Sequence, residues 1–319
     1  MELNTTSIAS VKQKPKRRRS GLLLQLYKNR FLYLLGLPGI LFFILFKYVP
    51  MGGIIIAFQN YSPIRGFLDS EFVGFAHFVR LFNEPDFWMI FRNTLLLSAL
   101  GIIFLFPAPI LLALILNEVR SQKYKRTVQT IIYLPHFISW VVIASLTFVF
   151  LSTEVGLVNK FLVFLGAEKV RFLMAENYFY PIILLQGLWK DVGWNTIIYL
   201  AAIAGVNPAL YEAAEIDGAG KFSKIWNVTI PSIIPTVIIL FILGLGNILE
   251  VNFEQLWLMQ NPLVLNVAEV FDTYVYKVGI QGGQFSYSTA VGIFKSFVGL
   301  ILILGANSWV RKKGYEGIW

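Results

Sequence analysis

The chain has 319 residues (36.2 kDa), of which 56% are hydrophobic and only 14% are charged, and its mean hydropathy is +0.66. A soluble domain is about 45–50% apolar and about 25% charged, so this composition excludes a soluble enzyme and a disordered chain and indicates an integral membrane protein. The net charge is +9. Cysteine is absent, which excludes disulfides, thiolate metal sites and cysteine nucleophiles.

Long apolar segments predict six transmembrane helices, because a helix needs about 20 mostly apolar residues to cross a bilayer. The first segment starts near Phe31, is interrupted by Lys47 and resumes over 54–58. Neither piece alone is long enough, so we expect one long or broken helix. The five other spans are predicted at 93–116, 131–151, 181–204, 231–250 and 288–310.

The expected organisation is an all-α membrane protein with a basic N-terminal tail (1–30), a six-helix transmembrane domain (31–310) and a short C-terminal tail (311–319). Lysine and arginine concentrate in both tails and in the connections after the second and fourth spans. Positive charge favours the cytoplasmic side, so both termini are predicted to be cytoplasmic. The basic run Lys16–Arg19 is interpreted as an anchor to the lipid bilayer, and no nucleic-acid partner is expected.

Prolines and glycines mark irregular positions within the spans. Pro107 and Pro109 lie in the middle of the second span, where proline removes a backbone hydrogen bond. An ordinary kink and a gating hinge both remain open there. Gly244 and Gly246 in the fifth span fit either close helix packing or space for a ligand.

Charged side chains inside the spans are more informative, because hydrocarbon penalises them. Lys295 lies well inside the sixth span and must face protein, water or an anionic partner. An ion pair with Glu250, at the end of the fifth span, and a polar cavity lined by the fourth to sixth spans are both compatible with this pattern.

A distinctive segment lies in the predicted cytoplasmic loop 205–230, between the fourth and fifth spans. Residues 211–221 read Tyr-Glu-Ala-Ala-Glu-Ile-Asp-Gly-Ala-Gly-Lys. The pattern predicts a short helix that starts after Pro208, carries acidic residues near its positive dipole end and terminates at Gly218. A second short helix is expected over about 222–227. A rigid helix on such a loop is suited to the groove of another protein.

This segment resembles the EAA motif of ABC-importer permeases: Glu-Ala-Ala, three residues, Gly, nine residues, then Ile-x-Leu-Pro. Pro231 matches the end of the motif, where Val228 and Ile230 replace Ile and Leu conservatively. The motif positions that match within the helix are Glu212, Ala213, Ala214 and Gly218.

The resemblance extends along most of the chain. Tyr211 and Asp217 are similar to the carbohydrate-uptake branch and its maltose-importer large permease, although this chain has neither the large extracellular insertion nor the extra N-terminal spans of that protein. Segments 46–50, 93–94 and 276–279 resemble a subgroup of polysaccharide permeases. That subgroup includes pectin- or rhamnogalacturonan-type and alginate-type oligosaccharide permeases.

The resemblance implies the type I fold of ABC-importer permeases and a non-catalytic transport subunit in a bacterial cell membrane. It also implies a second homologous permease, two cytoplasmic ATP-binding subunits and an extracellular or periplasmic solute-binding protein as partners. ATP and Mg²⁺ would bind the ATPase, so no cofactor is expected on this chain. The ATPase-coupling residues implied by the motif are Tyr211, Glu212, Ala213, Ala214, Asp217 and Gly218, with Glu212 as an ion-pairing or capping anchor.

The same resemblance places a sugar pathway in the last three spans. Aligned from Pro231 with the maltose-type permease, Asn247 falls near the sugar-contacting asparagine of the family. Sugars are held by aromatic stacking and by hydrogen bonds from amides and carboxylates, and Lys295 together with the resemblance favours acidic oligosaccharides. The expected pathway residues are Trp194, Asn247, Glu250, Asn252, Tyr287 and Lys295.

Two other classes of function remain as alternatives. A secondary transporter or channel for small polar solutes requires an internal repeat, which is not evident and would leave loop 205–230 unexplained. A membrane-embedded enzyme needs a cluster of catalytic acids or metal ligands, and Glu250 with Glu254 alone gives little support for one.

No catalytic or metal site is expected. The segment Gly218–Lys221 superficially resembles a phosphate-binding P-loop but fails its spacing. The only two histidines, His77 and His136, are predicted on opposite faces of the membrane, which argues against a histidine-based site.

Overall fold

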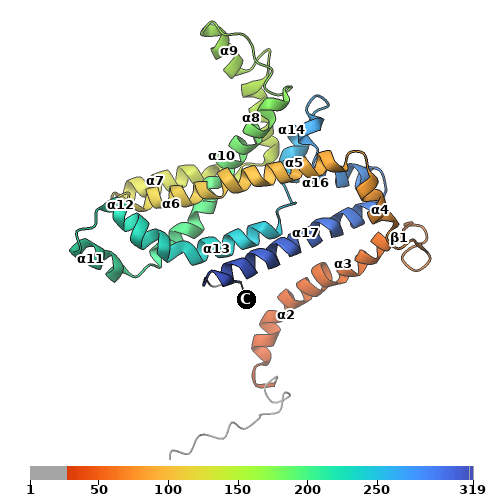
Figure 1. The fold of residues 1–319 in the computed structure, drawn as a ribbon, viewed down its shortest axis with the longest axis horizontal. Coiled ribbons are helices and arrows are strands. Elements are labelled where there is room, and N and C mark those ends of the chain that lie inside the picture. The colour runs from red at the N-terminus through yellow and green to blue at the C-terminus, as the bar shows by residue number, and fades with distance from the viewer. Residues whose placement is uncertain (1–26, 316, 319) are drawn as a thin grey trace, which may run out of the picture. The chain divides into compact units, whose positions relative to one another are not determined.

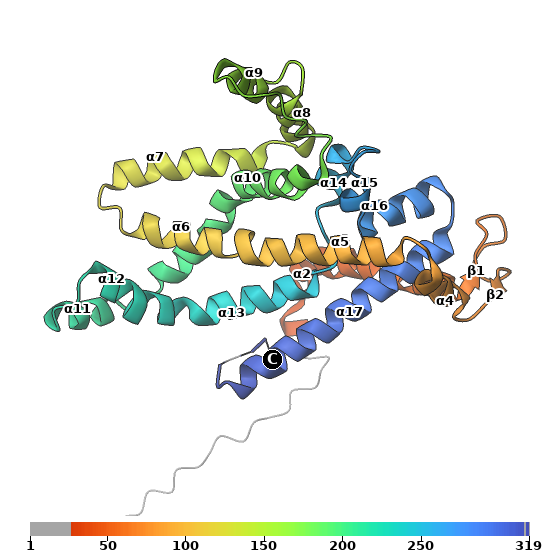
Figure 2. The ribbon, with the colours of Figure 1, turned by 45° about the horizontal axis from the view of Figure 1, so that its top comes forward.

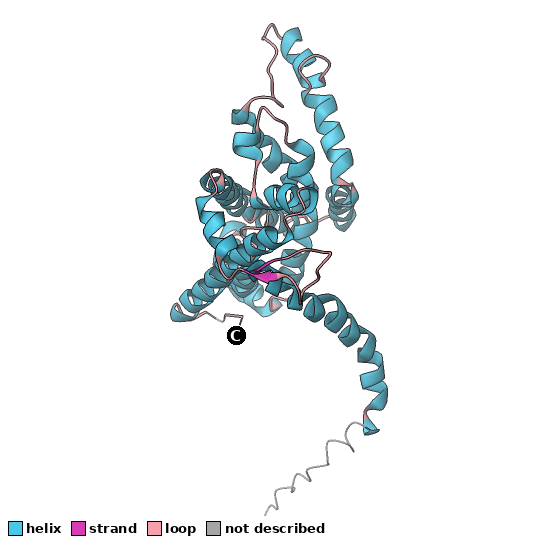
Figure 3. Ribbon diagram, turned by 90° about the vertical axis from the view of Figure 1, so that its right-hand side faces the viewer, coloured by secondary structure: helices cyan, strands magenta, loops and turns pink. Residues whose placement is uncertain are grey.

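The computed structural model describes residues 27–315 and 317–318, so most of the predicted N-terminal tail (1–30) lies outside the described residues. Helices account for most of the described chain, and its strands form one small hairpin (Figure 3). This confirms the predicted all-α architecture. The chain divides between Ile54 and Ile55 into two compact units, which are described separately.

The first unit contains the first predicted span. The span is one continuous helix, Arg30–Phe58, whose last turn continues into the second unit, so the prediction of one long helix is confirmed. Lys47 lies in a π-helical turn within it, and nearly all of its apolar side chains are exposed, as in a helix that is apolar all round and faces lipid. Its parts are α2 (Arg30–Phe43), η1 (Ile44–Tyr48), α3 (Val49–Met51) and η2 (Gly52–Phe58).

The second unit is a bundle of helices with the hairpin at one end (Figure 1). Within it α10 packs along α6, and α13 packs along α17 (Figure 2). Its elements are β1 (Gln59–Asn60), β2 (Glu71–Phe72), α4 (Ala76–Asn83), α5 (Phe87–Leu100), η3 (Gly101–Leu105), α6 (Pro107–Asn117), α7 (Gln122–Tyr133), η4 (Leu134–Phe137), α8 (Trp140–Leu151), α9 (Leu157–Phe164), α10 (Glu176–Ala204), α11 (Pro208–Ile216), α12 (Lys221–Lys224), η5 (Ile225–Thr229), α13 (Ile230–Gly246), α14 (Phe253–Met259), α15 (Leu265–Ala268), α16 (Phe271–Val275), η6 (Tyr276–Gln281) and α17 (Phe285–Lys312).

Length and composition support up to six membrane spans. Among the described residues, four unbroken helices are long and apolar enough to cross a membrane: α2–η2, α5–α6, α12–α13 and α17. Two further pairs meet the same criteria but are bent, α7–η4 with α8 by 98° and α10 with α11 by 69°. The predicted number of six spans is reached when each bent pair counts as one.

The second span continues through its two prolines. The turn η3, just before Pro107, is π-helical, and the N–H of Phe106 donates to the carbonyl oxygen of Gly101 at 3.0 Å. A π-helical turn holds one extra residue, and the missing N–H of proline interrupts the regular bonding pattern. The helix therefore accommodates its prolines with a π-helical turn and runs unbroken from Phe87 to Asn117.

The third span, predicted over 131–151, is broken within that range. Helix α7–η4 ends before residues 138–139, and α8 leaves at 98°. Pro135 lies in the last turn before the break, and the hydroxyl of Ser139 accepts the N–H of Val142 at 3.4 Å to begin α8. Both residues are ordinary helix-boundary signals.

Lys190 of α10 satisfies the backbone that this break exposes. Its side chain is only 8% exposed, and its ammonium group donates to the carbonyl oxygens of His136, at 2.8 Å, and Ile138. It also lies 5.3 Å from the ring centre of Trp140. Unpaired carbonyl groups at a helix end are costly in a low-dielectric setting, so this buried lysine stabilises the bend.

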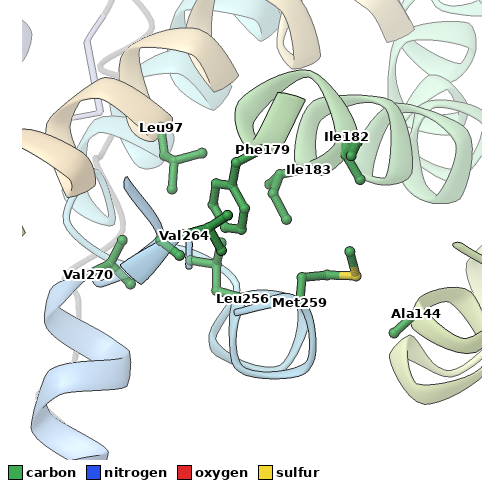
Figure 4. Packing of buried hydrophobic residues seen from close by; sticks show 10 residues of the cluster. Leu97, Ala144, Phe179, Ile182, Ile183, Leu256, Met259, Val264 and Val270 are labelled. Carbon is green, nitrogen blue, oxygen red and sulfur yellow. The ribbon is translucent and has the colours of Figure 1, made fainter. Parts of the chain in front are cut away.

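The largest apolar cluster joins α5, α8 and α10 to the connection between α13 and α16 (Figure 4). A buried amide pair reinforces the join: Nε2 of Gln255 in α14 donates to the carbonyl oxygen of Ile183 at 2.8 Å and to Oε1 of Gln186 at 3.0 Å. The buried members of the cluster are Leu97, Ala144, Phe179, Ile182, Ile183, Leu256, Met259, Val264, Ala268 and Val270.

The connection between the fifth and sixth spans is also tied to the second span. The side-chain amide of Asn93 is fully buried and donates to the carbonyl oxygens of Asn266 and Glu269 at 2.9 and 3.0 Å. The neighbouring hydroxyl of Thr94 accepts the N–H of Phe271 at 3.2 Å. Since buried backbone groups need partners, these two side chains fix the position of the connection.

We expect Lys190→Met to destabilise the protein, because it keeps the apolar stem but leaves two carbonyl oxygens without their donor. An unsatisfied buried polar group costs about 1–3 kcal/mol. The midpoint of thermal unfolding in detergent, followed by tryptophan fluorescence, should fall. The matched control is Lys160→Met on the exposed side of α9, and equal midpoints for the two variants would contradict the role given to Lys190.

Candidate functional site

The loop between α10 and α13 carries the predicted coupling helix as α11. The side chain of Asn207 accepts the N–H of Ala209 at 3.0 Å and caps the helix, and Pro208 occupies its first turn. This start agrees with the prediction and follows the usual preference for asparagine at the cap and proline just inside it. The hydroxyl of Tyr211 lies 3.0 Å from that of Thr229, which fastens α11 to the beginning of the fifth span.

The end of α11 is closed by a glycine turn. Gly218 has φ +78°, a conformation that side chains with a Cβ disfavour. The N–H of Ala219 donates to the carbonyl oxygen of Ala214 at 2.8 Å, and the N–H of Gly218 donates to that of Glu215 at 3.0 Å. These two bonds form a Schellman-type helix end, so the turn predicted at Gly218 is present.

The acidic residues of α11 do not lie where the sequence pattern suggested. Glu215 and Asp217 lie at the C-terminal end of the helix, where the dipole gives them no support. The ammonium group of Lys224 donates to Oε1 of Glu215 at 2.7 Å instead, and this hydrogen bond and its charge lower the pKa of the carboxyl. Glu212 is exposed and, within the described residues, forms no ion pair.

The surface of the loop is unusually apolar for an exposed segment. Within α11, Tyr211 and Ala214 are half-buried, whereas Glu212 and Ala213 are exposed. Large apolar side chains surround them and have no cover in the described chain, which is typical of an interaction surface. These exposed side chains are Leu210, Ile216, Phe222 and Trp226.

The second short helix predicted over 222–227 is not a separate element. α12, η5 and α13 run on as one helix from Lys221 to Gly246. The turn Ile225–Thr229 is π-helical and precedes Pro231, which follows the same rule as the turn before Pro107. The fifth span therefore projects into the loop and carries Lys224 and Thr229, which hold α11.

A pocket of about 780 Å³ lies between α6, α10 and α13. Trp194 and Asn195 contribute polar groups from α10, while Pro109 lines the pocket from α6 and Leu240 from α13. A smaller pocket of about 280 Å³ continues along α13, shares Asn195 and reaches Asn247.

A third pocket of about 250 Å³ extends from Asn247 and is lined by Glu250, Lys295 and Ser296. The structure thus brings Asn247, Glu250 and Lys295 to one pocket, and Asn247 links it to the one shared with Asn195. The indole of Trp194 lies in the first pocket. Four of the six predicted pathway residues therefore line neighbouring pockets.

The two glycines near the end of α13 have different environments. A Cβ at Gly244 would meet no other atom within 4 Å, and this residue lines two of the pockets. The carbonyl oxygen of Gly246 packs directly against Gly299 of α17. Gly246 therefore allows close packing of α13 against α17, and Gly244 leaves space in the pockets.

Trp194 is held by residues that the sequence pattern did not connect with it. The imidazole of His136 stacks on the indole with ring centres 4.5 Å apart and planes 3° from parallel. Nδ1 of His136 lies 2.8 Å from Oδ1 of Asp191, one turn before Trp194 in α10. The break in the third span brings His136 there, so the pairing could not be read from an unbroken helix.

The predicted ion pair between Lys295 and Glu250 is wrong. Lys295 pairs instead with Oδ1 of Asp272 in α16, whose Oδ2 accepts the N–H of Val251 at 3.1 Å. Asp272 belongs to the connection after the fifth span, and its distance in sequence from Lys295 gave no signal of the pairing. Glu250 lines the same pocket as Lys295 without forming the pair.

Tyr287 and Asn252 line none of these pockets. Tyr287 is 1% exposed, packs in an aromatic cluster around Phe271, and its hydroxyl lies 3.2 Å from that of Tyr274. Asn252 caps α14 by accepting the N–H of Gln255 at 3.3 Å. Both residues therefore shape the connection beside these pockets.

Among the described residues, no group of three or more histidine, aspartate and glutamate side chains could hold a metal ion. His77 lies near β1, where its Nε2 is 3.0 Å from the carbonyl oxygen of Gln59. His136 lies in the broken span beside Trp194. The two histidines are therefore in separate parts of the second unit.

Comparison with known proteins places this architecture in a family. A family model described as binding-protein-dependent transport system inner membrane component matches residues 106–313. The chain belongs to this family.

Two relatives from Bacillus subtilis (strain 168) resemble the permease along nearly its whole length. The polygalacturonan/rhamnogalacturonan transport system permease protein YteP is 53% identical over 304 residues, which cover 95% of each chain. Protein LplB is 51% identical over 294 residues, which cover 92% of each chain.

Solved structures of bacterial alginate transporters show the same fold. A chain of the alginate ABC transporter in complex with an alginate pentasaccharide-bound periplasmic protein matches with a TM-score of 0.85 and 43% identity, covering 93% of the permease and 99% of that chain. A chain of an ABC transporter that imports the acidic polysaccharide alginate matches with a TM-score of 0.83 and 43% identity, covering 91% and 98%.

The family assignment confirms the predicted type I permease fold and the non-catalytic role, since ATP hydrolysis in these systems belongs to a separate subunit. The permease is a multi-pass protein of the bacterial inner membrane. A secondary transporter, a channel and a membrane-embedded enzyme are thereby excluded as alternatives.

We expect Lys295→Met and Asp272→Asn each to lower the thermal midpoint, and the double variant to recover most of the loss. Removing one partner leaves the other charge unpaired, which costs about 3–5 kcal/mol for a fully buried pair and less here because Asp272 is partly exposed. Additive losses in the double-mutant cycle would contradict the pairing.

Proposed function

We propose that this permease imports acidic oligosaccharides and forms half of their translocation pathway. The observation that carries the cargo class is the agreement between two kinds of relative: one is a polygalacturonan/rhamnogalacturonan permease and the other belongs to a transporter of the acidic polysaccharide alginate. Both descriptions concern uronate-containing polymers, and both relatives are more than 40% identical to this chain.

The chemistry of the pockets supports this cargo. The indole of Trp194 offers an aromatic surface for a sugar ring, and the amide side chains of Asn195 and Asn247 offer hydrogen bonds to hydroxyl groups. The ammonium group of Lys295 has three donors. While one is directed to Asp272, another remains for a carboxylate that enters the pocket.

His136 and Asp191 contribute by holding the indole of Trp194 in place. An aromatic ring that is already fixed loses little conformational entropy when a sugar stacks on it. Glu250 lies in the same pocket as Lys295 and offers an acceptor for sugar hydroxyls. In this proposal Asn252 and Tyr287 position the neighbouring connection and do not contact cargo.

The proposed assembly pairs the chain with a second homologous permease and two cytoplasmic ATPase subunits, which bind ATP and Mg²⁺. The exposed apolar side chains around α11 would enter a groove of one ATPase. Glu212, Ala213 and Asp217 would lie at that contact, with Tyr211 and Gly218 holding the helix in position. A solute-binding protein would deliver cargo on the opposite side.

In the proposed orientation both termini and α11 are cytoplasmic. The basic connection between α6 and α7 and the basic end of α17 lie on the same side as α11 under this arrangement. Lysine and arginine are retained on the cytoplasmic side during insertion, which supports the assignment.

Gly218→Ala should weaken coupling, because an alanine at φ +78° is strained by about 1–3 kcal/mol and would alter the exit from α11. The matched control is Gly220→Ala, which has φ −70° and open space for a Cβ. With the permease complex in proteoliposomes, we expect Gly218→Ala to lower cargo-stimulated ATP hydrolysis at least several-fold. Equal activities of the two variants would contradict the role of this turn.

The cargo class is tested with Lys295→Met/Asp272→Asn, which removes the cation while keeping the pair matched. We expect uptake of galacturonate oligomers into proteoliposomes to fall about tenfold or more, as befits the loss of a charge-assisted hydrogen bond, while any uptake of neutral oligomers is retained. Unchanged uptake of galacturonate oligomers would overturn recognition by Lys295, and uptake of neutral oligomers alone by the wild type would overturn the cargo class.

A further inference from the structure

The β-hairpin of residues 59–72 ends in bare apolar side chains. Ile64 and Leu68, in the loop between β1 and β2, are each 96% exposed. Phe72 at its base is also exposed. Isolated exposed apolar residues are common on proteins, but two almost fully exposed aliphatic side chains on one loop need an explanation.

The loop is held rigidly, so this exposure is built into the fold. Nε2 of Gln59 donates to the carbonyl oxygen of Phe67 at 3.0 Å. The hydroxyl of Ser70 accepts the N–H of Ser62 at 3.1 Å and donates to the carbonyl oxygen of Gly66 at 2.6 Å. These bonds cross the loop and keep its tip from folding back over its own apolar side chains.

The base of the hairpin is fastened to the bundle. The N–H of Tyr61 donates to the hydroxyl of Ser286 in the first turn of α17 at 2.9 Å. The N–H of Val73 donates to the carbonyl oxygen of Phe58 at 2.8 Å. A displacement of the tip would therefore be transmitted to α17, the helix that also carries Lys295.

The hairpin lies at the end of the bundle opposite α11. Figures 1 and 2 both show it beyond α4 and past the ends of α5 and α17. A side chain past the helix ends does not face lipid chains, since the helices themselves span the hydrocarbon. The exposed tip is therefore directed toward the aqueous side away from the proposed ATPase contact.

We propose that the tip of this hairpin, Ile64 and Leu68, is a docking element for the cargo-loaded solute-binding protein. The inference rests on the proposed function, which places that partner on the side opposite α11. Arg65 lies between the two apolar side chains, and Asp69 and Glu71 follow them. An apolar anchor with a charged rim is the usual composition of a protein contact, so the tip would enter an apolar recess of the partner.

The variant Ile64→Ser/Leu68→Ser tests the contact, with Phe164→Ser at the exposed end of α9 as the matched control. The full permease–ATPase complex is reconstituted in proteoliposomes, and ATP hydrolysis is measured against the concentration of cargo-loaded binding protein. We expect the half-stimulating concentration to rise about tenfold or more, with the maximal rate unchanged and the control like the wild type. An unchanged half-stimulating concentration would overturn the proposal.

The two proposals fail in different ways. If the wild-type complex were not stimulated by any cargo-loaded binding protein, the proposed function would fail. If the wild type were stimulated and the hairpin variant responded identically, only the docking element would fail.

A cross-link identifies the partner directly, because the chain contains no cysteine that would compete for the label. Ile64→Cys is labelled with a benzophenone maleimide and irradiated in the full complex with cargo-loaded binding protein. We expect an adduct with the binding protein that weakens when cargo is omitted. An adduct with the second permease or with lipid would overturn the proposal.

Discussion

The backbone polar groups of the membrane spans must find partners inside the protein, because hydrocarbon offers none. Lys190 illustrates this constraint most clearly: its ammonium group satisfies the carbonyl oxygens left open where the third span breaks. The break in turn brings His136 against Trp194, so the position of the indole that lines the pocket of about 780 Å³ depends on one buried charge. The bend of the third span and the position of the Trp194 indole in the pocket wall thus both depend on the hydrogen bonds of Lys190.

Internal hydrogen bonds also join the pockets to the connection between the fifth and sixth spans. Asp272 holds Lys295 with one oxygen and the backbone of Val251 with the other, and Asn93 holds the same connection from the second span. The connection between the fifth and sixth spans is therefore attached to helices on both sides of it. A change at its position would be transmitted to the pocket that Lys295 lines.

The sequence predicted features whose signal is local. The coupling helix follows from Asn207, Pro208 and the glycine turn within a dozen residues, and apolar length alone located most spans. Features that depend on tertiary placement were not predictable. Asp272 became the partner of Lys295 because two distant elements meet, Tyr287 was buried by neighbours that pattern does not reveal, and the pattern over 131–151 did not reveal a bend of 98° within the third span.

The central claim is that α11 faces the cytoplasm and seats in an ATPase subunit. The absence of native cysteine permits a direct measurement with a single cysteine at Ile216, which is exposed on α11. In sealed vesicles of known orientation, a membrane-impermeant maleimide should label this cysteine only from the cytoplasmic side, and bound ATPase should protect it. Labelling from the extracytoplasmic side, or labelling that the ATPase leaves unchanged, would contradict the account.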